Sequence, residues 1–260
     1  MPVFEPFNSI GPSRYGQMIY NRNDVYIGRS IELYGEYSEG ETSLFEQLVE
    51  HGQLVVEAGA NIGAHTRFLA QQVGPAGKVL AFEPQRVIFQ TLCGNLAINS
   101  ITNVHCRHMA LGAETGQTVV PQLDYCQVNN FGGVGLEEFD EGEVVTIDSF
   151  HLPRCDFLKI DVEGMEEDVL RGAESTIGRF KPILYFKCDR TQKADSLIRY
   201  AHSLGYALYW HLPYLFNPQN FTDNHRNVFG EVVSKNILCV NKVLESQLSG
   251  FEKFDIPQAA

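Results

Sequence analysis

The 260-residue sequence lacks long apolar runs, basic tracts and a recognisable leader. No run approaches the roughly 20 apolar residues that span a bilayer, so we expect no membrane span. The N-terminus, MPVFEPFNSIGPSRYG, has no basic region followed by an apolar block, which argues against a signal peptide. The net charge is −12 without clustered Lys or Arg, which argues against a nucleic-acid partner because phosphate contacts need such clusters. We therefore expect a cytoplasmic protein that binds a small molecule.

Cysteines are few and scattered. None of the six shows C-x-x-C spacing: Cys93, Cys106, Cys126, Cys155, Cys188 and Cys239. This spacing argues against a disulfide framework and a zinc site, and favours reduced thiols.

The stretch LVVEAGANIG at 54–63 organises the rest of the chain. Its first three residues suit a strand buried on both faces, and glycines at 59 and 63 then lead into a predicted helix over 65–73. The pattern is not G-x-G-x-x-G, so the dinucleotide fingerprint does not fit. Glu57 at the strand end would repel a pyrophosphate and attract a cation such as an amino group or a sulfonium. The alternative is a tight turn with an exposed glutamate.

Strands and helices alternate along most of the chain, which predicts a mostly parallel sheet with helices on both faces. Apolar runs predict the strands 78–82, 103–110, 156–161, 183–186, 207–210 and 237–240, the last two antiparallel to each other. Helical periodicity predicts helices over 38–51, 85–99, 165–180 and 191–204, the first with a capping box from Ser38 and Glu41. Residues 112–150 break the alternation.

Two domain-level expectations follow. Residues 1–40 are predicted to be an arm that packs on the core, with a short hairpin around Asn23 and Asp24. Residues 41–260 are predicted to form a single domain that includes a long loop at 211–236. Connections of this length tend to be binding loops or lids, and the alternative is a surface excursion that buries its own aromatic residues.

Acidic residues follow three predicted strands, and in a doubly wound sheet the carboxyl ends of strands form the ligand site. Glu57 ends the first strand, Glu83 the second, and Asp161 and Glu163 follow a later one. Glu83 comes about 20 residues after the glycine turn, where a carboxylate can accept two hydrogen bonds from a ribose diol. The alternative for the Glu83-Pro84 pair is a helix-start signal.

The segments VVEAGANIG, AFEP and FLKIDVEGMEEDVLRGAE resemble the FkbM family of S-adenosylmethionine-dependent methyltransferases. The resemblance runs from roughly Glu41 to Cys188, and KIDVEG at 159–164 is its most specific part. It implies an α/β, Rossmann-like class I methyltransferase fold with an antiparallel strand near one edge of the sheet. It also implies S-adenosyl-L-methionine as the cofactor.

The resemblance assigns cofactor-binding residues. The glycine turn would hold the methionine part, Glu83 the ribose hydroxyls, and the loop after the third strand would border the adenine. The implied set is Glu57, Gly59, Ala60, Asn61, Gly63, Thr66, Glu83, Pro84, Met109, Ala110 and Asp161.

Asp161, Glu163 and His211 are the catalytic candidates. A carboxylate within reach of the acceptor could act as base, or Asp161 could help bind a divalent ion. Structurally, Asp161 could only fix the turn and Glu163 only cap the next helix. His211 follows Tyr209-Trp210 at a predicted strand end, although a loop histidine is more often a surface group.

Lys187 follows the predicted strand 183–186 and departs from the family pattern, in which an acidic residue stands near the end of the corresponding strand. A lysine beside Asp161 would neutralise it and weaken a metal site, and Asp189 could supply the missing carboxylate. We therefore assign no metal ligands and leave dependence on a divalent metal open.

Two further groups are candidates for the walls of the site, with plain packing and a plain glycine turn as alternatives. They are Tyr15, Tyr20, Arg29, Tyr34 and Tyr37, and the loop residues Asn130, Phe131, Gly132 and Gly133.

The sequence therefore predicts methyl transfer to a small acceptor, and the expected acceptor group is a hydroxyl of a sugar, lipid or secondary metabolite. One alternative is a non-catalytic S-adenosylmethionine-binding protein. A nicotinamide-dependent oxidoreductase is disfavoured by the missing fingerprint. The acceptor and the oligomeric state, including a homodimer, stay open.

Overall fold

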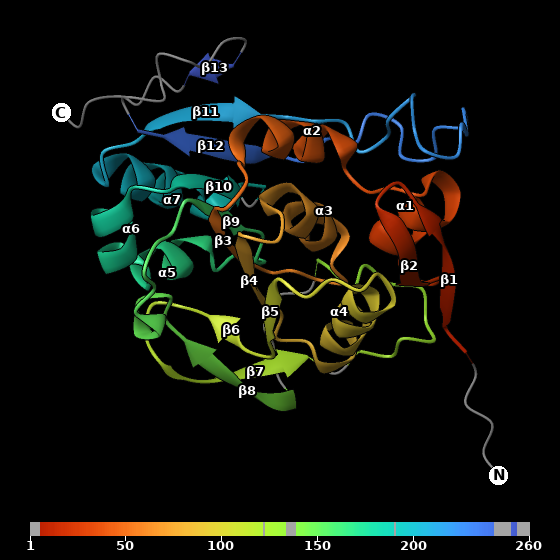
Figure 1. Ribbon diagram of the computed structural model, residues 1–260, viewed down its shortest axis with the longest axis horizontal. Coiled ribbons are helices and arrows are strands. Elements are labelled where there is room, and N and C mark those ends of the chain that lie inside the picture. Colours follow the sequence, from red (N-terminus) through yellow and green to blue (C-terminus); the bar gives the residue numbers. More distant parts are fainter. Residues whose placement is uncertain (1–5, 122, 134–138, 190, 242–250, 254–260) are drawn as a thin grey trace.

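A central sheet with the strand order β13-β11-β12-β10-β9-β3-β4-β5 dominates the computed structural model, which describes residues 6–121, 123–133, 139–189, 191–241 and 251–253 (Figure 1). The strands are β3 (Leu54–Ala58), β4 (Lys78–Phe82), β5 (Val104–Arg107), β9 (Phe157–Ile160), β10 (Ile183–Lys187), β11 (Ala207–His211), β12 (Asn236–Val240) and β13 (Glu252–Lys253). Neighbours from β10 to β5 are parallel, whereas β12 is antiparallel to both β10 and β11. The predicted Rossmann-like class I fold is confirmed.

Helices cover both faces of the sheet because successive strand residues point to opposite sides. Val55 and Phe157 pack on one face under α2 (Glu39–Leu48), α3 (Ala64–Val73) and α4 (Arg86–Ile98). Val56 and Leu158 pack on the other face under α5 (Glu166–Arg171), α6 (Glu174–Phe180) and α7 (Thr191–Ser203). The central strands are therefore mostly apolar, and β3 and β9 also carry the buried charged residues Glu57 and Lys159.

Two predicted elements are divided in the structure. The helix expected over 165–180 is interrupted between α5 and α6, where a Cβ on Gly172 would lie 2.0 Å from the Gly112 carbonyl oxygen. The Asp148 carboxylate then accepts the N–H groups of Ser175 and Thr176, each at 2.8 Å, and so starts α6. The strand expected over 103–110 is also divided. Its last part belongs to β6 (Ala110–Leu111), which forms a separate three-stranded sheet with β8 (Phe139–Val145) and β7 (Gly116–Pro121).

The N-terminal segment contains a hairpin of β1 (Asn8–Ser13) and β2 (Gly16–Asn21), followed by α1 (Ile27–Tyr34). The prediction of a hairpin around Asn23 and Asp24 was wrong, because the turn lies at residues 14–15, where Ser13 Oγ donates to the Gly16 carbonyl at 2.7 Å. The sequence analysis did not predict α1. Arg67 of α3 anchors the hairpin by donating to Ser13 Oγ and to the Gln17 carbonyl.

The predicted capping box was also wrong. Ser38 precedes α2 with a φ of +47°, and its hydroxyl donates to Glu41 Oε1 at 2.7 Å. The serine oxygen therefore does not cap a backbone N–H of the helix.

The connection between β11 and β12 returns on itself near the sheet. Tyr214 bridges Val233, and Ser234 N–H donates to the Pro213 carbonyl at 2.9 Å. Farther out, Phe229 packs with Tyr34 of α1, whose hydroxyl donates to the Arg226 carbonyl at 2.7 Å. The late loop and the N-terminal segment thus pack against each other. No helix in the described ranges is long and apolar enough to cross a membrane.

Candidate functional site

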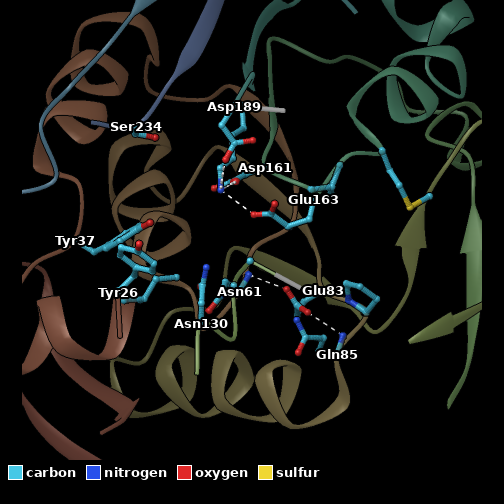
Figure 2. Close-up of a pocket in the computed structure, with 18 of the residues that line it drawn as sticks. Tyr26, Tyr37, Asn61, Glu83, Gln85, Asn130, Asp161, Glu163, Asp189 and Ser234 are labelled. Carbon is cyan, nitrogen blue, oxygen red and sulfur yellow. Dashed lines mark hydrogen bonds and ion pairs between the residues drawn. The ribbon is translucent and has the colours of Figure 1, made fainter. Parts of the chain in front are cut away.

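A cavity of about 480 Å³ lies at the carboxyl ends of β3, β4, β9 and β10 (Figure 2). Its remaining walls come from segments outside the sheet. Tyr26 and Tyr37 of the N-terminal segment lie opposite Glu83 and Glu163, and Ser234 belongs to the late loop. The volume is that of a typical small-molecule site, and the position is the ligand position of doubly wound sheets.

Gly59 forms the floor of the cavity, where the tips of β3 and β9 approach each other. Its φ is +79°, and a Cβ would lie 2.0 Å from the Asp161 carbonyl oxygen. The N–H groups of Gly59 and Ala60 both donate to the Phe82 carbonyl, at 3.0 and 2.9 Å. Glycine is required here because any side chain would push the two strand tips apart.

Glu83 presents a buried carboxylate at one end of the cavity. Its oxygens accept the N–H groups of Asn61 at 3.0 Å and Gln85 at 2.8 Å. Burial raises the pKa of Glu83 to about 7, against the opposing effect of these two hydrogen bonds. Each oxygen keeps lone-pair capacity for a further donor.

Gln85 adds an unused acceptor at the same end. Its side-chain Nε2 donates to the Phe131 carbonyl at 2.9 Å, which ties the 130–133 loop to this wall. Its Oε1 is buried and has no hydrogen-bond partner within the described structure. A ligand with paired hydroxyls and further donors, such as a ribose nucleoside, fits this combination of acceptors.

Glu57 does not line the cavity, which corrects its predicted role at the mouth of the site. Its side chain is 1 % exposed, accepts the Thr66 hydroxyl at 2.6 Å and lies 3.5 Å from Lys159 Nζ. Lys159 of the KIDVEG motif therefore supplies the cation that Glu57 was expected to draw from a ligand. The same ammonium lies 3.4 Å from Asp161 Oδ2.

Asp161 and Glu163 face the cavity beside Lys187. The Lys187 ammonium lies 2.8 Å from Glu163 Oε1, 3.6 Å from Asp161 Oδ1 and 3.7 Å from Asp189 Oδ2. Burial alone would raise the pKa of Asp161, but Lys159 and Lys187 outweigh it and lower the pKa to about 2. Among the residues described, no group of three His, Cys, Asp or Glu is arranged to hold a metal ion.

The structure brings together most, but not all, of the predicted cofactor-binding residues. Those that line the cavity are Gly59, Asn61, Glu83, Pro84, Met109, Ala110 and Asp161. Ala60, Gly63 and Thr66 do not line it and are buried, as Glu57 is. Thr66 is turned toward Glu57, and a Cβ on Gly63 would lie 2.7 Å from Leu92 Cδ1. These buried residues support the glycine turn on the side away from the cavity.

His211 lies outside the cavity, contrary to its selection as a catalytic candidate. Its Nδ1 is 2.8 Å from the Tyr185 hydroxyl, on the sheet face that α2 covers. Its ring packs edge-on against Phe251, and burial lowers its pKa. We therefore do not propose a catalytic role for His211.

The sequence analysis did not name several cavity residues. Tyr26 and Ile27 come from the N-terminal segment, and Leu215 and 232–235 come from the loop that was predicted only as a whole to be a binding loop or lid. Gln85, Leu111, Val162 and Met165 adjoin residues that were named. Gln85 could have been found, since it follows Glu83-Pro84 directly. Of the five wall candidates in the N-terminal segment, Tyr37 lines the cavity, and Tyr15, Tyr20, Arg29 and Tyr34 do not.

The glycine loop contributes Asn130, Gly132 and Gly133 to the cavity, and Phe131 is buried beneath it. Residues 134–138, which follow this loop, lie outside the described residues.

Comparison with known proteins agrees with this geometry. Residues 57–208 match the methyltransferase FkbM domain. Methyltransferase 1 of Beauveria bassiana is 30% identical over 145 residues, which are 46% of this chain and 58% of that protein. Methyltransferase sdnD of Sordaria araneosa is 30% identical over 156 residues, which are 46% of this chain and 60% of that protein. The match therefore spans less than two thirds of each relative.

Among solved structures, methyltransferase FkbM from Methylobacillus flagellatus superposes with a TM-score of 0.52 and 19% sequence identity, over 76% of this chain and 50% of that one. This likeness supports the fold. Because the FkbM match covers more than half of the sequence and includes both the glycine turn and the KIDVEG motif, this chain belongs to the FkbM methyltransferase family, whose cofactor is S-adenosylmethionine.

Proposed function

We propose that this protein transfers a methyl group from S-adenosylmethionine to a hydroxyl of a small acceptor, such as a sugar, a lipid or a secondary metabolite. One observation carries the proposal. A single cavity has the buried Glu83 carboxylate at one end and the Asp161, Glu163 and Lys187 cluster at the other (Figure 2). Such a cavity can hold a ribose-bearing cofactor and a second substrate together.

The residues present fit the cofactor. Glu83 and Gln85 offer free acceptor capacity for the ribose hydroxyls, and Met109 and Ala110 supply an apolar border for the base. Gly59 lets the backbone approach the ligand closely. When bound, this cofactor supplies an electrophilic methyl group on a positively charged sulfur.

Asp161 has the role of a proton acceptor in this proposal. A pKa of about 2 makes it a weak base in the resting protein. A weak base is enough to accept this proton, because a hydroxyl oxygen that gains a methyl group becomes strongly acidic until its proton leaves. Much of the acceleration then comes from holding the acceptor oxygen in place.

We also propose that residues 41–260 act as one methyltransferase domain and that the N-terminal segment completes its acceptor wall. Tyr26 and Tyr37 support this division of labour because both line the cavity. The net charge of −12 favours a small acceptor over a nucleic acid.

Calorimetry with S-adenosylhomocysteine, followed by a mass-shift screen of hydroxyl compounds, tests the proposal. We expect saturable binding, and Glu83→Ala should weaken it more than tenfold, about 1.4 kcal/mol. An unchanged affinity would remove Glu83 from the ribose role. The panel includes transfer RNA, and methylation of the RNA alone would contradict the small-acceptor assignment.

A non-catalytic cofactor-binding protein is the second candidate, favoured by the ammonium that Lys187 places in the cavity. Binding of S-adenosylmethionine without transfer to any compound of a broad panel would support it. A tight response to NADH with none to S-adenosylmethionine would instead indicate an oxidoreductase.

A further inference from the structure

The Lys187 ammonium stands where three carboxylates of the cavity converge. Of its contacts to Glu163, Asp161 and Asp189, the one to Glu163, at 2.8 Å, is within hydrogen-bond distance, and the other two are 3.6 and 3.7 Å. An ammonium has three N–H donors. Lys187 therefore keeps donor capacity toward the cavity that it lines.

The position of Lys187 relative to Glu83 defines which substrate it faces. Figure 2 shows Asp161 between the Glu83 end of the cavity and the end formed by Asp189 and Ser234. If the ribose occupies the Glu83 end, as the proposed function requires, the acceptor must enter the opposite end. That end contains the Lys187 cluster.

We propose that Lys187 is the built-in cation of the acceptor site, donating a hydrogen bond to the acceptor oxygen and supplying the positive charge that a divalent metal ion could otherwise supply. The inference rests on the proposed function and adds to it the residue that holds the acceptor. It also predicts that transfer does not need a metal.

Charge supports this role. Asp161 and Glu163 raise the pKa of Lys187 against the lowering effect of burial, so the ammonium stays charged in neutral solution. A fixed positive charge at the convergence point repels a metal ion that would use the same oxygens. Lys187 is also held on the end of β10, so it cannot diffuse away as an ion can.

The chemistry balances without a further reactant. Lys187 holds the acceptor oxygen and favours loss of its proton by placing a positive charge beside it. A lone pair of that oxygen forms the new bond to the methyl carbon, and the electrons of the broken carbon–sulfur bond go to sulfur. The hydroxyl proton passes to the Asp161 carboxylate, and Lys187 keeps its own protons.

A titration with Mn²⁺, followed by the paramagnetic resonance signal of the free ion, tests the cation role without an acceptor. Wild-type protein with S-adenosylhomocysteine should show no saturable site. Lys187→Met removes the cation that Glu163, Asp161 and Asp189 share, although Lys159 still lies 3.4 Å from Asp161, and the variant should gain a site with a dissociation constant below about 1 mM. Lys235→Met is the matched control, because Lys235 lines the same cavity and has no ion pair to a carboxylate among the described residues.

Three outcomes of this titration overturn the proposal. These are a saturable Mn²⁺ site in the wild type, no gain in folded Lys187→Met, or an equal gain in Lys235→Met. Thermal unfolding establishes that each variant is folded. If Lys187→Met does not fold, Lys187→Gln replaces it.

An acceptor found by the screen allows the second measurement. Lys187→Met should lose about 100-fold in kcat/KM while its affinity for S-adenosylhomocysteine changes less than about twofold. Lys187→Arg, which keeps the charge, should recover part of the loss, and EDTA should not slow the wild type. A rate that EDTA abolishes and Mg²⁺ restores would overturn the proposal.

The two proposals fail in different ways. Absence of S-adenosylhomocysteine binding would contradict the proposed function. Intact binding of S-adenosylhomocysteine together with a metal site in the wild type would contradict only the proposed role of Lys187.

Discussion

Lys159 Nζ lies 3.5 Å from Glu57 Oε1, and both side chains are almost completely buried, at 2 % and 1 % exposed. The pair sits directly behind the cavity, because Lys159 also lies 3.4 Å from Asp161. Two lysines thus bracket Asp161, with Lys159 behind it and Lys187 in front.

Loss of one partner of this buried pair should destabilise the fold. Lys159→Met leaves Glu57 as an unpaired buried carboxylate, and we expect a loss of about 3–5 kcal/mol in the free energy of unfolding, measured with urea. Lys159→Met combined with Glu57→Gln should lose less than the single variant. Equal stability of Lys159→Met and the wild type would show that the pair does not hold the site.

Cofactor affinity should depend on pH through Glu83. Its pKa is about 7 before binding, and ribose hydroxyl donors favour the charged carboxylate, so binding lowers the pKa and releases a proton. Affinity for S-adenosylhomocysteine should therefore rise by up to about tenfold from pH 6 to pH 8. Glu83→Gln should bind weakly with a flat profile, and a flat wild-type profile in calorimetry would contradict the assignment.

Asp161→Asn should separate cofactor binding from transfer. The amide keeps the shape of the side chain but cannot accept a proton, so we expect a rate loss of about 100-fold with cofactor affinity largely retained. The matched control is Asp156→Asn, because Asp156 precedes β9 at its other end and accepts the Leu54 N–H at 2.7 Å. Full activity of Asp161→Asn would end its candidacy.

Gln85→Leu should loosen the 130–133 loop. The change removes the donor to the Phe131 carbonyl and leaves that carbonyl unpaired, which costs about 1–3 kcal/mol. We expect weaker binding of S-adenosylhomocysteine and faster limited proteolysis near Phe131. Unchanged cleavage and affinity would show that packing of Phe131, which stacks on Tyr125, holds the loop alone.

The sheet could be predicted from the sequence because its strands are built on short apolar runs, as at 79–82 and 183–186. The hairpin before residue 22 could not, because it is held in place by tertiary contacts from Arg67 to Ser13 and Gln17 and from Asn95 to Ile19. The break between α5 and α6 was missed for the same reason, since the Asp148 carboxylate that starts α6 comes from a distant loop.

In the site, too, local sequence patterns predicted the residues at strand ends but not those that tertiary contacts bring in. Glu83, Asp161 and Glu163 follow strands, so the alignment of parallel strand ends was enough to bring them together. Glu57 also ends a strand, but its side chain turns toward Lys159, which no local pattern reveals. The walls formed by Tyr26 and Ser234 depend on packing between the two ends of the chain.

The late loop has a consequence for redesign. Leu215, Val232 and Ser234 line the cavity from a connection whose two arms pair with each other, while the glycine turn and Glu83 belong to the sheet. Combinatorial libraries restricted to 213–216 and 231–235 would therefore vary the residues around the acceptor while leaving the residues proposed to bind the cofactor unchanged. If this connection were exchanged between relatives, we would expect a change in the position of the acceptor that is methylated.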